Sequence, residues 1–191
     1  MLIFEAVFAQ GKKVPMASAP ILKDRLAARA ALVERHISLE NSHDLEGVLA
    51  TFGEEARYDD EPWAEHYEGR DGVRNFYTQL MSALPDLEIA VQRQHVTDEA
   101  IVVEVMIRGT HLGGWRGLPA TGRRVEFPLC GVYTFDAQDR LAGEKIYYDR
   151  GTVLRQLGVF HDPRSVLGQL AILATHPATI ARALARKILH G

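Results

Sequence analysis

The first part of the chain carries apolar residues at helical spacing. Between residues 20 and 39 they recur every three or four positions with charged residues between them, which predicts a long amphipathic helix. The stretch 45–52, "LEGVLATF", predicts a short helix after the turn formers of "NSHD". A third helix is expected after "GRDG", and Pro85 ends it.

After Pro85 the hydrophobic period changes from about four residues to two. Alternation of this kind predicts strands over 87–96, 100–111, 123–135 and 141–149. Helices followed by consecutive strands joined by short or medium connections are typical of an α+β domain. We expect a mostly antiparallel sheet that curls over the N-terminal helices.

The pattern divides the chain into three parts. Residues 1–19 form a loose leader, residues 20–159 the domain, and residues 160–191 a helical extension that is broken at "THPAT". The last helix is basic and amphipathic, and such a helix can lie on a membrane. We favour the alternative that it docks on the domain or on a second subunit.

Composition narrows the class of protein. With 191 residues, 47% of them hydrophobic and 25% charged, the chain suits one globular domain with room for a ligand cavity. A net charge of −3 offers no broad basic surface, which argues against nucleic acid as a partner. The lone Cys130 cannot form an intrachain disulfide, and Glu5 interrupts the first apolar run. These features indicate a cytoplasmic protein.

Common motifs for metals and phosphates are absent from the sequence. There is no glycine-rich phosphate loop, no G-x-S-x-G elbow and no H-E-x-x-H. His36 and His43 are seven positions apart, but a helix break at Asn41 separates them, and we find no carboxylate spaced to complete a metal triad. We therefore expect no metal and no other cofactor.

Strand parity points to candidate site residues. His111 shares the parity of the apolar residues that end in Ile107, so it should face the interior unless Gly109 forms a bulge. Tyr147 and Asp149 share a face of the last strand. That strand is apolar or aromatic on both faces, which predicts a covered outer face and favours a homodimer through it.

A carboxylate and an imidazole at strand ends can enter a cavity and carry acid/base chemistry. Burial raises the pKa of a carboxyl group toward the range useful for proton transfer, and an imidazole can polarise a carbonyl oxygen. Four aromatic residues are expected to wall the site for a hydrophobic ligand: Tyr58, Trp63, Phe127 and Tyr147.

Structural roles compete with these assignments. Asp149 is well placed to cap a helix over 151–157, and residue chemistry alone favours that role. His111 can instead bond a backbone carbonyl in the glycine-rich turn. The "DDE" at 59–61 reads as a solvated strand end, with the alternative that one carboxylate beside Tyr58 faces the cavity.

Three stretches carry a family resemblance: "GTHLGGWRGLPATGRRVEF", "GVYTFDAQDRLAGEKIYYD" and "VLRQLG". Over residues 25–159 the chain resembles the SnoaL-like polyketide cyclases of the nuclear transport factor 2 and ketosteroid isomerase superfamily. The resemblance implies a conical α+β barrel with a mixed, mostly antiparallel sheet. It implies Asp149 as general acid/base for an intramolecular aldol ring closure without a cofactor, and His111 as a group that binds the substrate's oxygens.

The sequence therefore predicts a cofactor-independent cyclase or isomerase that acts on a hydrophobic carbonyl compound. One alternative is a small-molecule-binding or scaffold domain that has lost the chemistry. A second is an epoxide hydrolase or dehydratase. The epoxide hydrolase would need a second inward carboxylate, from Asp59, Asp60 or Glu61, paired with Arg108. The parity of Arg108, opposite to that of His111, argues against this second alternative.

Overall fold

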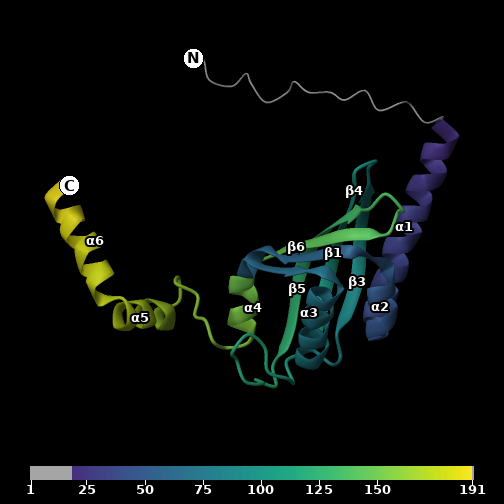
Figure 1. Ribbon diagram of the computed structural model, residues 1–191. Coiled ribbons are helices and arrows are strands. Elements are labelled where there is room, and N and C mark those ends of the chain that lie inside the picture. Colours follow the sequence, from purple (N-terminus) through teal and green to yellow (C-terminus); the bar gives the residue numbers. More distant parts are fainter. Residues whose placement is uncertain (1–18, 191) are drawn as a thin grey trace, which may run out of the picture.

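A computed structural model describes residues 19–190, so nearly all of the expected leader lies outside the described residues (Figure 1). The helices are α1 (Ala19–Asn41), α2 (Leu45–Thr51), α3 (Gly69–Ala83), α4 (Arg150–Gln156), α5 (Val166–Thr175) and α6 (Pro177–His190). The strands are β1 (Phe52–Asp60), β2 (Glu65–Glu68), β3 (Glu88–Val96), β4 (Ala100–Thr110), β5 (Arg124–Phe135) and β6 (Leu141–Tyr148). A 3₁₀ turn, η1 (Glu61–Trp63), links β1 to β2.

The strands form one curved, unclosed sheet in the order β2-β1-β6-β5-β4-β3. Strands β1 and β6 run parallel, and the other neighbours pair antiparallel. The α+β class and the mixed, mostly antiparallel sheet are therefore confirmed. Helix α3 packs on β1 and β2, and α1 contacts α2 and β3, so the early helices lie against one side of the curve (Figure 1).

The core follows the alternation in the sequence. Along β4, residues of one parity are buried and those between them are partly exposed, so the strand packs one face on the helices. The buried set on this strand is Ile101, Val103, Val105 and Ile107. Helix α3 contributes Val73, Phe76 and Tyr77 at helical spacing. Burial of each such side chain is worth roughly 1.5–3 kcal/mol.

Strands β1 and β2 do not follow from hydrophobic alternation, although 59–61 was expected to be a strand end. Strand β1 reads "FGEEARYDD", which is mostly charged and does not alternate cleanly. Its Asp59 is buried nevertheless, because Arg57 Nε and His66 Nδ1 each lie 2.7 Å from Asp59 Oδ1. The pairing with β6, far along the chain, holds this strand in the sheet. Tertiary contacts thus override a weak local pattern.

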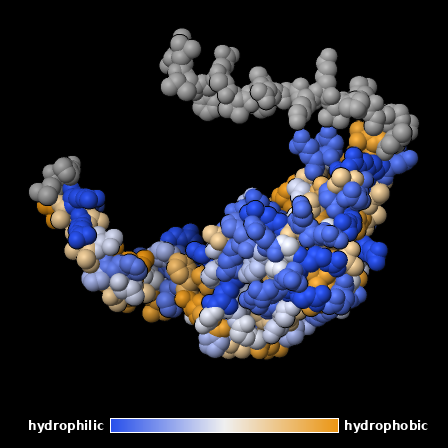
Figure 2. Space-filling view, in the orientation of Figure 1, coloured by the Kyte–Doolittle hydropathy of each residue, from blue (hydrophilic) through white to orange (hydrophobic). Residues whose placement is uncertain are grey.

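The C-terminal extension forms two helices that break at His176, as the sequence predicts. In Figure 1, α5 and α6 lie apart from the sheet, and Figure 2 shows apolar surface along them. Large apolar side chains there are exposed: Val166, Leu167, Leu170, Leu173, Leu184 and Ile188. Docking of α5 and α6 on the domain is therefore not seen. Within residues 19–190, no helix combines the length and apolarity that crossing a membrane requires.

Candidate functional site

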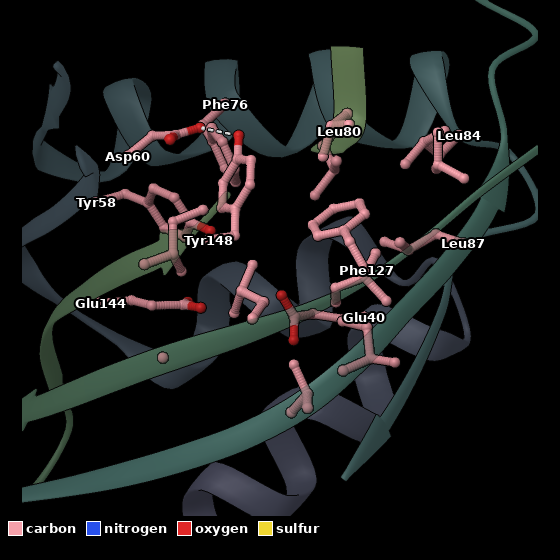
Figure 3. Close-up of a pocket in the computed structure, with 18 of the residues that line it drawn as sticks. Glu40, Tyr58, Asp60, Phe76, Leu80, Leu84, Leu87, Phe127, Glu144 and Tyr148 are labelled. Carbon is pink, nitrogen blue, oxygen red and sulfur yellow. Dashed lines mark hydrogen bonds between the residues drawn. The ribbon is translucent and has the colours of Figure 1, made fainter. Parts of the chain in front are cut away.

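A cavity lies between the concave face of the sheet and helices α1, α3 and α4 (Figure 3). Most of its wall is aliphatic or aromatic and comes from β4, β5, α3 and α4. Three carboxyl groups and one imidazole interrupt this apolar wall: Glu40, Asp60, Glu144 and His111. An apolar cavity with a few convergent polar groups is the usual form of a small-molecule site.

Asp60, the last residue of β1, is 1% exposed and carries one free oxygen. Its Oδ2 accepts hydrogen bonds from Arg116 Nη2 at 2.7 Å and from Tyr148 OH at 3.3 Å, and Figure 3 shows the second of these. Trp63 Nε1 donates to Tyr148 OH at 2.9 Å. Asp60 Oδ1 is buried and has no hydrogen-bond partner within residues 19–190.

Burial raises the pKa of Asp60 to about 6, although the positive charge of Arg116 opposes the shift. The Arg116 side chain is only 6% exposed, and its guanidinium lies 4.7 Å from the ring centroids of both Trp63 and Trp115. Its backbone has a left-handed φ of 51°, a conformation that costs about 1–2 kcal/mol in a non-glycine residue. The aromatic rings thus fix a cation against Asp60.

The "DDE" stretch divides between the two faces of the sheet. Asp60 lines the cavity, and Asp59 makes its ion pairs with Arg57, His66 and Lys145 instead. The structure therefore shows the alternative interpretation, in which one of these carboxylates faces the cavity. Successive residues of a strand point to opposite faces of the sheet. Of the neighbours Asp59 and Asp60, one was therefore bound to face the cavity side, which was the signal in the sequence.

His111, which follows β4, lies where its parity predicts. It is fully buried, it lines the cavity, and burial lowers the pKa of its ring. Its Nδ1 accepts a hydrogen bond from the backbone N–H of Thr121 at 3.3 Å. The proton of the neutral ring is consequently on Nε2, which is buried without a partner within the described chain. His111 therefore offers an N–H donor at the cavity wall.

Asp149 lies outside the cavity, so the expectation that it shares a chamber with His111 is wrong. Its side chain is 65% exposed. It caps α4: a carboxylate oxygen accepts from the backbone N–H of Gly151 at 2.8 Å and another from Thr152 Oγ1. These bonds, led by that from Thr152, lower the pKa of Asp149. The capping role that residue chemistry favoured is the one observed.

The parity of the last strand was right, but the face assigned to the cavity was wrong. Tyr147 does lie opposite Ile146 and Tyr148, as expected, and the register shift between Thr134 and Phe135 precedes all three residues. Tyr147, expected in the site, is 46% exposed on the outer face, and Tyr148 lines the cavity instead.

The other three predicted wall residues are all close to the cavity. Tyr58 and Phe127 line it, and Tyr58 stacks on Phe76 with ring centroids 3.7 Å apart. Trp63 is not among the lining residues. It supports the site from behind through Tyr148 and Arg116.

A second polar cluster joins α1 to β6 and was missed in the sequence. His36 Nε2 lies 3.0 Å from Tyr77 OH and 3.3 Å from Glu144 Oε2, and Tyr77 OH donates to Glu144 Oε2 at 2.8 Å. Glu40 Oε1 is 3.7 Å from His36 Nε2, and burial raises the pKa of Glu40 to about 7.

The spacing of His36, Glu40 and Glu144 also suits a metal ion, since one ligand atom from each lies within 4.8 Å of the others. The view that no carboxylate completes a triad with His36 is therefore wrong on geometry. Glu40 lies one helical turn along α1, which was the available signal, and Glu144 arrives from a distant strand.

Comparison with known proteins agrees with this architecture. The family model for SnoaL-like polyketide cyclase matches residues 30–157. A candidate SnoaL-like polyketide cyclase from Jannaschia sp. CCS1 superposes with a TM-score of 0.65 at 19% identity, covering 74% of this chain and 96% of that one. AclR, a candidate hydroxylase from Streptomyces galilaeus, gives 0.62 at 20% identity and covers 71% and 99%.

A further structural neighbour has a different described role. SalBIII, an epoxide hydrolase/cyclase-like enzyme in pyran ring formation in polyether salinomycin, superposes with a TM-score of 0.57 at 16% identity, covering 66% of this chain and 94% of that one. At such identities these likenesses establish the fold, whereas the family match extends over most of the domain. The chain belongs to the SnoaL-like polyketide cyclase family.

Proposed function

We propose that the protein is a cofactor-independent cyclase or isomerase that acts on a hydrophobic carbonyl compound, with Asp60 as the acid/base. The observation that carries the proposal is that two residues lining one cavity, Asp60 and His111, each have a buried atom without a partner within residues 19–190, namely Oδ1 and Nε2. A buried polar atom without a partner costs about 1–3 kcal/mol. A bound carbonyl compound that engages both atoms offsets that cost.

The chemistry requires a base near carbon and a donor near oxygen. Asp60 Oδ1 takes a proton from the carbon next to a carbonyl, and His111 Nε2–H donates to the carbonyl oxygen as negative charge develops there. In a cyclase the enolate carbon forms a C–C bond to a second carbonyl of the same molecule, and the oxygen of that carbonyl takes the proton from Asp60. In an isomerase Asp60 returns the proton to another carbon.

Arg116 and Tyr148 position the base. Both donate to Asp60 Oδ2, which leaves Oδ1 free, and Trp63 fixes the Tyr148 hydroxyl. The positive charge of Arg116 also keeps a fraction of Asp60 ionised against the effect of burial. Near neutral pH the carboxylate can therefore both accept and return a proton.

Epoxide opening is a second candidate chemistry. It requires a carboxylate at the cavity that is paired with an arginine, and Asp60, which lines the cavity, pairs with Arg116. Arg108, the arginine considered from the sequence, pairs instead with Glu88 and Glu126. A binding-only domain is the third candidate, and it predicts ligand uptake without turnover.

We also propose a homodimer formed through the outer face of the sheet, where Tyr147 is 46% exposed. A cytoplasmic location is proposed because the single cysteine, Cys130, is a free thiol.

Exchange of carbon-bound protons tests the enzymatic proposal without knowledge of the natural substrate. α-Tetralone, an apolar ring ketone, is incubated with the protein in D₂O, and deuterium incorporation next to the carbonyl is followed by NMR. The proposal predicts faster exchange than in buffer containing heat-denatured protein. Binding of α-tetralone, seen by ligand-observed NMR, with exchange at the buffer rate would support the binding-only candidate.

A further inference from the structure

Glu40 supplies a third unpartnered atom at the cavity wall. Its side chain is 3% exposed, it lines the cavity, and Oε2 has no hydrogen-bond partner within residues 19–190. Figure 3 shows that it enters from α1, whereas Asp60 enters from β1 on the side next to α3. The chemistry proposed for Asp60 and His111 makes no use of this carboxyl group.

We propose that Glu40 is a second binding site for a neutral oxygen of the ligand, so that the substrate carries oxygen functions at two separate places on an apolar body. This inference rests on the proposed function and adds the substrate class. A carbonyl or hydroxyl group fits because Oε2 of Glu40 has no partner within residues 19–190, whereas Oε1 lies 3.7 Å from His36 Nε2, and most of the other cavity residues are apolar.

The hydrogen bonds around His36 determine which groups are already satisfied. Thr51 Oγ1 donates to Val48 O at 2.6 Å, so it can only accept from His36 Nδ1–H at 2.8 Å. Tyr77 gives its own proton to Glu144. The contact of His36 Nε2 with the Tyr77 oxygen is therefore favourable when Nε2 also carries a proton.

This arrangement makes His36 an imidazolium ion that balances one buried carboxylate, Glu144. Glu40 has no second cation beside it, and burial accordingly favours its neutral carboxyl form. A neutral carboxyl group can donate a hydrogen bond to a carbonyl or accept one from a hydroxyl. It is thus suited to a ligand oxygen in an apolar cavity.

A divalent cation is the alternative occupant of the site at Glu40, because His36, Glu40 and Glu144 are spaced suitably to bind one. A metal needs a free lone pair on His36 Nε2. The contacts of Tyr77 OH with Nε2 at 3.0 Å and with Glu144 at 2.8 Å instead describe a closed hydrogen-bond network. The unpartnered Glu40 Oε2 lies outside this network, so a ligand oxygen accounts for the site better than a cation.

The test compares two probes that differ by one oxygen: α-tetralone and 6-hydroxy-1-tetralone, whose hydroxyl is on the far side of the fused ring. Affinities are measured by NMR titration for the wild type, Glu40→Leu and Glu40→Gln. Glu34→Leu is the matched control, because Glu34 lies on the exposed side of the same helix. Circular dichroism verifies that each variant is folded.

We expect the wild type and Glu34→Leu to bind the hydroxylated probe about tenfold more tightly than α-tetralone. Glu40→Leu should lose that preference, and Glu40→Gln should keep most of it, because an amide retains a donor and an acceptor. Equal affinities of the wild type for the two probes, no measurable binding of either, or an unchanged preference in Glu40→Leu would overturn the proposal. If Glu40→Leu does not fold, the proposal is overturned when Glu40→Gln loses the preference for the hydroxylated probe.

Stoichiometric uptake of zinc by the wild type that is lost in Glu40→Gln would also overturn it in favour of a metal site. The proposed acid/base function is assessed separately, by deuterium exchange into α-tetralone, which depends on Asp60. If deuterium exchange is absent but the wild type still prefers the hydroxylated probe, only the acid/base function of Asp60 is rejected. If exchange is observed but the preference for the hydroxylated probe is absent, only the second binding site at Glu40 is rejected.

Discussion

The hydroxyl of Tyr148 donates a 3.3 Å hydrogen bond to Oδ2 of Asp60, and these residues are 88 positions apart in the sequence. The bond joins the end of β6 to the end of β1, which are parallel neighbours in the sheet. It orients one carboxylate oxygen of this cavity-lining residue, and the other oxygen has no partner in the part of the chain that the structure describes.

Replacing Tyr148 with Phe should shift the pH dependence of deuterium exchange. Only the ionised carboxylate accepts a proton, so the wild-type rate should rise with pH around a midpoint near the Asp60 pKa of about 6. The hydroxyl of Tyr148 lowers that pKa, so its loss should move the midpoint upward. Rate profiles of both proteins between pH 4.5 and 8 would check this. An unchanged or lower midpoint would show that the bond does not act on the base.

Replacing Asp149 with Asn should affect stability and leave chemistry unchanged. The carboxylate caps α4 and pairs with Arg155, so its loss should lower the free energy of unfolding by about 1 kcal/mol. Urea denaturation measures this change. The exchange rate of α-tetralone in the folded variant should equal that of the wild type, and a large loss of exchange would return Asp149 to the reaction.

Replacing Glu40 with Gln should flatten the pH dependence of stability. Because burial raises the Glu40 pKa to about 7, the folded protein binds this proton more tightly than the unfolded chain does. The free energy of unfolding must then fall as pH rises from the unfolded pKa of Glu40 toward 7, by roughly 2–3 kcal/mol. Urea titrations at several pH values should show that fall in the wild type and a clearly smaller fall in the variant.

His36 also makes the free energy of unfolding fall as pH rises. The Glu40→Gln variant retains part of this contribution. The pKa of His36 is also raised, through Glu40 and Glu144 acting against burial, so its contribution is present below pH 6.5 and is lost as pH rises through the folded pKa. Identical pH slopes in the wild type and Glu40→Gln would contradict the assignment of the buried proton to Glu40.

The sequence predicts most of the fold because hydrophobic periodicity identifies its long helices and strands. The alternation ending in Ile107 placed His111 in the cavity, and β3 to β6 begin and end within one residue or so of expectation. Strand β1 was expected only as a strand end at 59–61, and the burial of its Asp59 was missed, since that carboxylate is satisfied by ion pairs that only the folded chain assembles.

Only part of the site was predictable from the sequence: His111, Tyr58 and Phe127 line the cavity as expected, whereas Asp149 and Tyr147 do not. Both faces of "LAGEKIYYD" carry apolar or aromatic residues, so alternation alone could not tell that Tyr148 faces the cavity and Tyr147 the outer side. The cluster of His36 with Glu144 depends on a contact between residues 108 positions apart. Such contacts follow from topology and are not visible in local sequence.

The most direct measurement of the central claim compares Asp60→Asn with Asp59→Asn in the exchange of α-tetralone protons at pH 7. The two aspartates are adjacent, but only Asp60 lines the cavity. Asp60→Asn should bind α-tetralone and lose roughly a hundredfold or more of the exchange rate, whereas folded Asp59→Asn should retain it. Exchange at the wild-type rate in Asp60→Asn would contradict the account.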